Sequence, residues 1–321
     1  MPSGNGAGIR TGAQYLEGLR DGRRIWTRGK RVEDVTTEPG MARGVATLAS
    51  FLDRQHDPRW QDTITYVDDN GIRCQMSFMI PKSPEDIKAR GRSFYEWATW
   101  SNGMFGRTPD YKNASMTAFA GALPYLEQST KGPGGKAMAQ NFLDYYDHIR
   151  TNDKVLTHTL INPTFSHAPE TGGKFSNEVA LRVMEETDTG IIVNGARLLA
   201  TLGPFADELE VFPSTLLKTG DDQVPFSFAF SIPVDTPGLR MICRDTYDHD
   251  KPTFDAPLAS RYEEMDAVVI FENVLVPWER VFLYGEPELC NGALNETNGV
   301  IHMMHQVVCG KLAKAEFMVG L

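Results

Sequence analysis

The spacing of apolar and polar residues predicts helices along the chain up to about residue 150. Thr11 and Gln14 have the pattern of a capping box, in which each side chain accepts a hydrogen bond from the other residue's backbone N–H. Apolar residues then recur at helical spacing from Tyr15 to Leu19. The same criteria predict further helices over 40–54, 83–100 and 136–150, and a small hairpin over 25–32.

One further helix has a well-marked start. Thr108 is a favourable N-cap, Pro109 suits the first helical position, and Asp110 is favoured at the positive end of the helix dipole. Arg107 then precedes the helix, and Tyr111 lies in its first turn. We therefore expect both side chains to face one pocket at this helix N-terminus.

From about residue 152 the pattern changes to short β runs separated by Gly, Pro and Asp, which is typical of a barrel or sandwich of antiparallel strands. Strands are predicted over 179–183, 190–195, 196–202, 209–212, 225–233, 239–243 and 267–276, with an acidic turn over 185–188. Helical periodicity returns after residue 277, and one long helix is predicted over 300–318. We expect an α+β protein with an N-terminal helical domain (1–153), a middle antiparallel β-barrel (154–281) and the start of a C-terminal helical domain (282–321).

Composition and charge exclude some classes of function. The formal net charge of −10 argues against a nucleic-acid partner, because such proteins are more often basic. No apolar run reaches the ~18 residues of a membrane span, and residues 1–8 lack the apolar core of a signal peptide. The four cysteines are widely spaced, so we expect a cytoplasmic protein with reduced thiols and no metal. His302, His305 and Cys309 match no strong ligand signature, and packing is the preferred interpretation.

Arg107, Tyr111 and His158 are the side-chain types that can bind and ionise a phenol. The pKa of a phenol is about 10, so little of it is ionised at neutral pH. A nearby guanidinium favours the phenolate, an imidazole accepts the proton, and a tyrosine hydroxyl fixes orientation. Each residue also has a structural interpretation: Arg107 as a surface partner of Asp110, Tyr111 as a core residue and His158 as a hydrogen-bonded structural histidine. Residue type and spacing alone leave both interpretations open.

Several separate segments, in order, resemble one enzyme family. They are residues 10–23, 32–37, 107–111, 158–163 and 274–279, together with the turn, strand and Asn-Gly-x-Arg unit of 186–197. This set is similar to the oxygenase component of 4-hydroxyphenylacetate 3-monooxygenase and to its relatives that act on chlorophenols and other phenols. The resemblance implies an acyl-CoA dehydrogenase-like fold over nearly the whole chain.

The resemblance also implies a reaction and its residues. It indicates an enzyme that takes reduced FAD from a separate flavin reductase and uses dioxygen to hydroxylate a phenol ortho to its hydroxyl, giving a catechol. Arg107, Tyr111 and His158 would be the catalytic and substrate-binding residues. Residues on the flavin side would be His158, Thr159, Leu160, Thr164 and Thr201. The loop over 212–224 would be a variable substrate lid.

Members of this family are longer, with a C-terminal helical bundle that supplies tetramer contacts and part of the flavin site. A homotetramer or dimer is therefore expected only where that bundle is present. Three alternatives stay open. They are a dehalogenating halophenol monooxygenase, a flavoprotein like 4-hydroxybutyryl-CoA dehydratase, whose iron–sulfur cluster is held by three cysteines and a histidine, and an inactive fragment.

Overall fold

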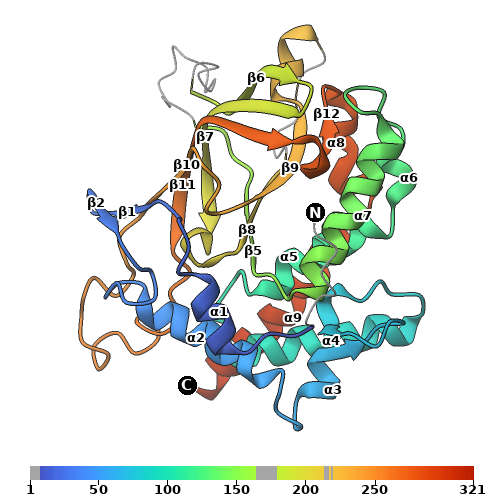
Figure 1. Ribbon diagram of the computed structural model, residues 1–321. Coiled ribbons are helices and arrows are strands. Elements are labelled where there is room, and N and C mark those ends of the chain that lie inside the picture. Colours follow the sequence, from blue (N-terminus) through green and yellow to red (C-terminus); the bar gives the residue numbers. More distant parts are fainter. Residues whose placement is uncertain (1–7, 164–178, 213–216, 218–219) are drawn as a thin grey trace.

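The computed structural model describes residues 8–163, 179–212, 217 and 220–321. Helices fill the lower half of the molecule, and strands fill the upper half, with α7 running along one side of them (Figure 1). The helices are α1 (Gly12–Gly18), α2 (Ala42–Arg54), α3 (Gln61–Ile64), α4 (Pro84–Thr99), α5 (Pro109–Ala120), α6 (Leu123–Leu126), α7 (Gly135–Thr151), α8 (Pro287–Glu296) and α9 (Gly299–Gly320).

The strands form two main sheets. Their bounds are β1 (Ile25–Thr27), β2 (Lys30–Val32), β3 (Thr65–Val67), β4 (Arg73–Gln75), β5 (Leu156–Thr159), β6 (Arg182–Thr187), β7 (Gly190–Thr201), β8 (Glu208–Val211), β9 (Phe228–Pro233), β10 (Leu239–Cys243), β11 (Asp266–Pro277) and β12 (Val281–Tyr284). The larger sheet has the order β2-β1-β10-β11-β7-β6, and the smaller has the order β12-β9-β8-β5. Strands β3 and β4 form a separate hairpin.

Three expectations for the strands are wrong in detail. The pairs β1–β10 and β5–β8 are parallel, so the strands are not all antiparallel. The predicted acidic turn at 185–188 lies mostly within β6, because Glu185 and Glu186 pair with Ile192 and Ile191 of β7. Strand β5 was not predicted, because its four residues show no clear alternation of apolar and polar side chains. The predicted domain ranges stay a prediction; the hairpin β1–β2 pairs with β10, so the larger sheet draws on both of the first two ranges.

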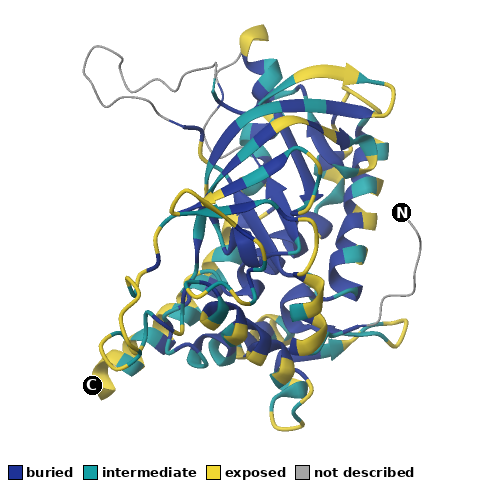
Figure 2. Cartoon of the chain, turned by 60° about the vertical axis from the view of Figure 1, so that its left-hand side comes forward, coloured by how far each residue is buried: buried dark blue, intermediate teal, exposed yellow. Residues whose placement is uncertain are grey.

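Helix α5 is the central helix of the molecule. Every residue from Pro109 to Ala120 is buried, and the helix contacts α7, α9 and β5. Its small and apolar residues allow close packing on all sides, which is typical of an interior helix. Figure 2 shows the same burial along most of the strands, whereas exposed positions gather on loops, on outer helix faces and on strand β6.

The capping box of α1 is confirmed. The Thr11 hydroxyl accepts from the Gln14 N–H at 3.2 Å, and the Gln14 side chain accepts from the Thr11 N–H at 2.8 Å. Helix α5 begins at Pro109 as predicted, but the side chain of Thr108 makes no capping bond to it. The Thr108 hydroxyl instead accepts from the Gln306 side chain of α9 at 3.1 Å. A long-range contact has taken the place of the local cap.

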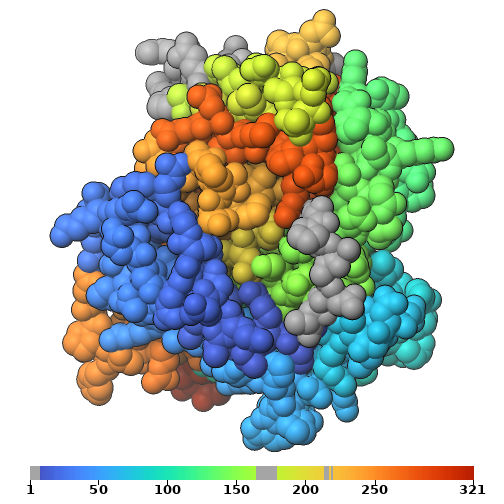
Figure 3. Space-filling view, viewed as in Figure 1, coloured from blue at the N-terminus to red at the C-terminus, as the bar shows by residue number. Residues whose placement is uncertain are grey.

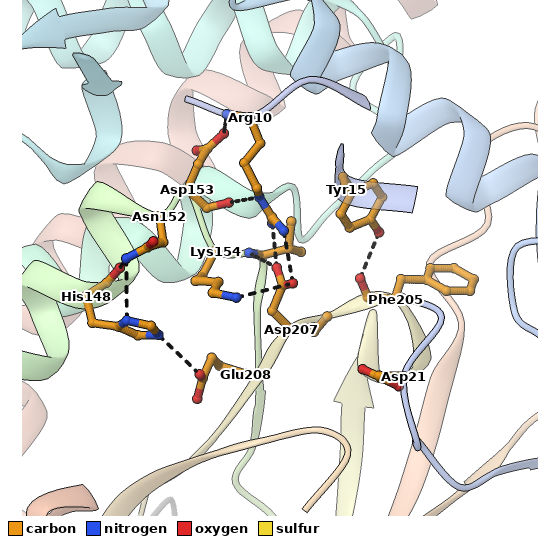
Figure 4. A network of polar contacts seen from close by, with 12 residues as sticks. Arg10, Tyr15, Asp21, His148, Asn152, Asp153, Lys154, Phe205, Asp207 and Glu208 are labelled. Carbon is orange, nitrogen blue, oxygen red and sulfur yellow. Dashed lines mark hydrogen bonds and ion pairs between the residues drawn. The ribbon is translucent and has the colours of Figure 1, made fainter. Parts of the chain in front are cut away.

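A buried polar network joins the N-terminal segment to the strands (Figure 4). Arg10 donates to both carboxylate oxygens of Asp207, at 3.1 and 2.6 Å, and to the Asp153 carbonyl at 3.0 Å. Asp207 in turn accepts from the Val155 N–H at 2.7 Å. Burial acts to raise the pKa of Asp207, but the Arg10 guanidinium, the Lys154 charge and the Val155 N–H together hold that pKa below its usual value. This network fixes the starts of the parallel strands β5 and β8.

The same network reaches α5. Asp153 accepts from Gln55 at 2.8 Å and from Gln75 at 2.6 Å, and Gln75 accepts from Asn113 of α5 at 3.1 Å. The network therefore fixes the position of α5 relative to the start of β5.

The N-terminal segments and α7 flank the strands on the face shown in Figure 3.

Helix α9 packs on α4 and α5 with one face and leaves the other uncovered. The exposed fractions are 65% for Ile301, 50% for Met304, 60% for Val308 and 53% for Leu312. These four positions recur at helical spacing and form an apolar stripe. Among the helices of the described residues, none combines the length and apolarity needed to cross a bilayer.

Candidate functional site

Helix α5 and strand β5 bring the three predicted catalytic residues together. The guanidinium carbon of Arg107 lies 4.2 Å from the centroid of the Tyr111 ring. The ring centroids of Tyr111 and His158 are 6.0 Å apart, with an angle of 44° between the planes. Tyr111 and His158 are buried, and Arg107 is half-buried. A guanidinium, a phenol and an imidazole thus stand side by side at the N-terminus of α5.

A small cavity lies beside Tyr111 and His158. Its volume is about 40 Å³, and its apolar wall includes Phe119, Phe212 and Met303. This volume suits a few water molecules, so the wall must move before an aromatic ring enters. Arg107 opens into an adjacent cleft of about 40 Å³ beside α9. His158 therefore lines the cavity beside Tyr111, and Arg107 lines the neighbouring cleft.

The environment of His158 favours the neutral imidazole. Burial and the nearby cations Lys112 and Arg107 hold the pKa of His158 well below its usual value. A neutral imidazole has a free nitrogen lone pair at neutral pH. A phenol placed in the cavity is therefore able to donate a hydrogen bond to this lone pair of His158.

Glu264 holds the backbone beside Arg107. Its carboxylate accepts from the N–H of Gly106 and from the N–H of Arg107, the latter at 3.1 Å. Burial raises the pKa of Glu264 to about 7, although both backbone hydrogen bonds oppose that rise. Sequence reasoning missed this residue, because nothing local to Glu264 indicates a contact with so distant a segment.

The suggested ion pair between Arg107 and Asp110 is not formed among the described residues. The Arg107 side chain donates to the Gly106 carbonyl at 3.0 Å. Asp110 is fully buried and accepts from Gln306 at 3.2 Å, and burial raises its pKa to about 7. The Arg107 guanidinium is left to face the Tyr111 ring.

A second charged pair beside the cavity was also missed. Lys112 of α5 lies 2.6 Å from Glu210 of β8, and both side chains are buried. A signal was available in the sequence for Glu210, because it interrupts the apolar run of a predicted strand, whereas Lys112 stands among polar neighbours and gave no signal. Charged residues at such positions are rarely buried without a partner.

Residues predicted on the flavin side lie where β5 meets β7. The Thr157 hydroxyl donates to the Thr201 carbonyl at 2.6 Å, and the Thr159 hydroxyl donates to the Leu198 carbonyl at 2.8 Å. The Thr201 hydroxyl donates to Asp266 at 2.7 Å. Leu160 follows β5, and its carbonyl accepts a hydrogen bond from the Arg197 guanidinium of β7 at 2.6 Å. Thr164 lies outside the described residues.

A bulge exposes an apolar side chain next to Thr201. Two residues of β7, Leu198 and Leu199, oppose one residue of β11, and Leu199 adopts a left-handed conformation with φ of 63°. Leu199 is 52% exposed, and the nearby Ile161 is 40% exposed. Apolar side chains beside a threonine hydroxyl fit one face of a flat aromatic cofactor. Of the predicted lid over 212–224, only residues 212, 217 and 220–224 are described.

The histidines of α9 pack against α4. The Nδ1 atom of His302 lies 2.9 Å from a guanidinium nitrogen of Arg90, and the His305 ring stands edge-on to Phe94 at 5.3 Å. Burial, together with the Arg90 charge, lowers the pKa of His302 to about 4. These contacts favour the packing interpretation of both histidines.

The low pKa of His302 predicts a pH-dependent stability. Between pH 6.5 and about 4 the unfolded chain binds a proton that the folded chain does not, so the free energy of unfolding falls as the pH falls through this window. Replacing His302 with Gln, which keeps an acceptor for Arg90, is expected to remove on the order of 1 kcal/mol of that loss. Urea unfolding at several pH values measures the slope. The exposed His56 changed to Gln is the control, and equal slopes in both variants would contradict this assignment.

Comparisons with known proteins agree with the fold and identify the family. A family model described as "4-hydroxyphenylacetate 3-hydroxylase N terminal" matches residues 11–283. The chain is 44% identical over 313 residues to the 4-hydroxyphenylacetate 3-monooxygenase oxygenase component of Thermus thermophilus. The matched region covers 97% of this chain and 62% of the relative. It is 31% identical over 317 residues to the 2,4,6-trichlorophenol monooxygenase of Cupriavidus pinatubonensis, which covers 98% of this chain and 59% of the relative.

A solved structure is also similar. The crystal structure of a 4-hydroxyphenylacetate 3-monooxygenase oxygenase component complexed with FAD and 4-hydroxyphenylacetate matches with a TM-score of 0.88 at 44% identity, over 97% of this chain and 63% of that chain. The expected α+β fold is confirmed, because this solved relative shares it. This chain spans less than two thirds of the length of these relatives. It belongs to the 4-hydroxyphenylacetate 3-hydroxylase family, as the resemblance of its motifs indicated.

Proposed function

We propose that this chain carries the substrate site of a flavin-dependent monooxygenase that hydroxylates a phenol, such as 4-hydroxyphenylacetate, ortho to its hydroxyl and gives a catechol. The observation that carries the proposal is the convergence of Arg107, Tyr111 and His158 at the start of α5. Membership of the family supports it, because a relative has been solved with both FAD and 4-hydroxyphenylacetate bound.

The three residues have separate tasks in this proposal. The Tyr111 hydroxyl donates a hydrogen bond to the phenol oxygen and fixes the ring, while neutral His158 accepts the phenol proton. The Arg107 guanidinium stabilises the negative charge that remains on the oxygen. The resulting phenolate is a stronger nucleophile at its ortho carbon than the neutral phenol. The apolar wall of the cavity keeps water away from the reacting ring.

The cofactor in this proposal is reduced FAD, with dioxygen as cosubstrate. When bound, reduced FAD supplies the electrons that activate dioxygen for transfer of one oxygen atom. His158, Thr159, Leu160 and Thr201 are proposed to lie along the flavin ring, and the apolar surface of Leu199 supports this placement. Thr164 is proposed on the family resemblance alone.

A separate flavin reductase is the proposed source of reduced FAD, because the similar proteins are named as oxygenase components. A homotetramer or dimer is proposed for the longer form found in relatives, and the exposed apolar stripe of α9 supports a further contact there. The cytoplasm is the proposed compartment, supported by four cysteines that are all free thiols.

Two of the alternatives differ in how well the observations support them. A halophenol substrate has specific support from the similarity to a trichlorophenol monooxygenase, and the apolar wall of the cavity suits a halogen as well as a hydrogen. A dehydratase with an iron–sulfur cluster is disfavoured. Among the described residues, no group of three His, Cys, Asp or Glu side chains lies close enough together to hold a metal ion.

An assay with supplied reduced FAD tests the proposed function. The chain is titrated with reduced FAD without oxygen, then mixed with oxygenated buffer and either 4-hydroxyphenylacetate or 2,4,6-trichlorophenol. We expect a catechol from the first, or release of chloride from the second. The control is free reduced FAD without the chain, which yields hydrogen peroxide only. Bound and oxidised flavin with no hydroxylated product from either phenol would contradict the proposal and favour an inactive fragment.

A further inference from the structure

The buried pair of Lys112 and Glu210 stands directly behind the proposed catalytic residues. Lys112 follows Tyr111 on α5, and its ammonium lies 2.6 Å from the Glu210 carboxylate. Lys112 is only 7% exposed, and Glu210 is 0% exposed. His158 and Glu210 are direct partners in the parallel pair β5–β8, so their side chains leave the same face of the sheet. The pair, the imidazole and the Tyr111 ring therefore form one cluster.

The pair presents its positive end to the cavity. Lys112 lines the cavity together with Tyr111 and His158, whereas Glu210 lies behind it, outside the lining. Among the described residues, no carboxylate lines this cavity. The charged or titratable groups that line it are thus Lys112, Tyr111 and His158, while Arg107 lies over the Tyr111 ring and lines the adjacent cleft.

Stability does not explain this pair. Burying two charges costs desolvation energy that their attraction only partly returns, and apolar residues of the same size often serve as well. Burial raises the pKa of Glu210 to about 7, although the Lys112 charge opposes that rise. Protonation of Glu210 leaves the ammonium uncompensated. Both states give the cavity a positive potential.

We propose that Lys112 is a specificity-determining residue that makes the cavity bind its phenol as the phenolate. This inference rests on the proposed function, since it assigns a phenol to the cavity. The phenol O–H bond breaks on binding, the proton leaves through His158 to solvent, and Lys112 keeps its own proton. The ammonium stabilises the phenolate oxygen, and Glu210 holds the ammonium in place. Phenols that ionise readily are the preferred substrate class.

Binding of 4-nitrophenol tests this inference without turnover, because its phenolate is yellow and its neutral form is not. The bound ligand is titrated with pH in the wild-type chain, in Lys112→Arg and in the double variant Lys112→Met/Glu210→Gln. The double variant removes both charges, so no buried charge is left unpaired. Lys154→Met is the matched control, because Lys154 lies 3.9 Å from Asp207 in the network shown in Figure 4, away from the cavity.

We expect bound 4-nitrophenol to ionise at a lower pH than the free ligand in the wild-type chain, in Lys112→Arg and in Lys154→Met. In the double variant, the ratio of phenolate to phenol at a given pH is expected to fall about tenfold, a shift of about one pH unit. The same midpoint in the wild-type chain and the double variant would overturn the inference, as would a wild-type chain that does not bind 4-nitrophenol. If the wild-type chain forms a catechol but the double variant leaves the titration midpoint unchanged, this inference alone is contradicted. If the midpoint shifts but no catechol forms, the proposed function alone is contradicted.

Discussion

Replacing His158 or Arg107 with alanine is expected to lower the rate of catechol formation by about 10²–10⁴-fold while leaving the fold in place. His158→Ala removes the group that accepts the phenol proton. Arg107→Ala removes the cation that faces the Tyr111 ring at 4.2 Å. Neither residue supports a buried ion pair among the described contacts, so Arg107→Ala should change the free energy of unfolding little. His158→Ala lowers it by the cost of the cavity that the buried ring leaves, without unfolding the chain.

The measurement is catechol formed per reduced FAD oxidised, with hydrogen peroxide counted in the same sample. Both variants are expected to divert oxidised flavin to hydrogen peroxide, because the phenol is no longer activated. Arg59→Ala is the control for Arg107, since the side chain of Arg59 is 77% exposed and pairs locally with Asp57. Unchanged coupling of flavin oxidation to catechol in both site variants would remove the proposed roles.

Replacing Arg10 with methionine is expected to lower the free energy of unfolding by about 3–5 kcal/mol. The change leaves the Asp207 carboxylate buried without its bidentate partner. It also frees the start of β5, because Asp207 holds the Val155 N–H and Arg10 holds the Asp153 carbonyl. The rate of hydroxylation should fall as well, since β5 carries His158.

Guanidinium-induced unfolding of Arg10→Met and the wild-type chain measures this loss. The control is Arg20→Met, whose ion pairs with Glu17 and Asp34 are exposed and worth about 0–1 kcal/mol. A further variant, Arg10→Met/Asp207→Leu, removes both charges and is expected to recover part of the stability. Equal losses in Arg10→Met and Arg20→Met would show that the network in Figure 4 does not hold the strands.

Local rules predicted the helices well but not their tertiary partners. The start of α5 at Pro109 follows from residues next to each other in sequence. The contacts of Thr108 and Asp110 with Gln306 do not, because they depend on where α9 packs. Strand β5 shows the same limit, since a four-residue run is defined by its pairing with β8 and by the Asp207 network rather than by its own pattern.

The site divides in the same way. Arg107, Tyr111 and His158 were found because their chemistry and their motifs agree, and the structure places them together. Glu264 and Lys112–Glu210 were missed because each contact joins segments that are far apart in the sequence. A charged residue within an apolar run, Glu210, was the one available signal, and it indicates a residue without indicating its partner.

The central claim is that Arg107, Tyr111 and His158 meet around one phenol oxygen. A crystal structure of this chain with 4-hydroxyphenylacetate tests it most directly. We predict the phenol oxygen within hydrogen-bonding distance of the Tyr111 hydroxyl and a His158 ring nitrogen, on the side of the ring nearest the Arg107 guanidinium. A ligand bound elsewhere, or seated with its carboxylate against these three side chains and its phenol turned away, would contradict the account.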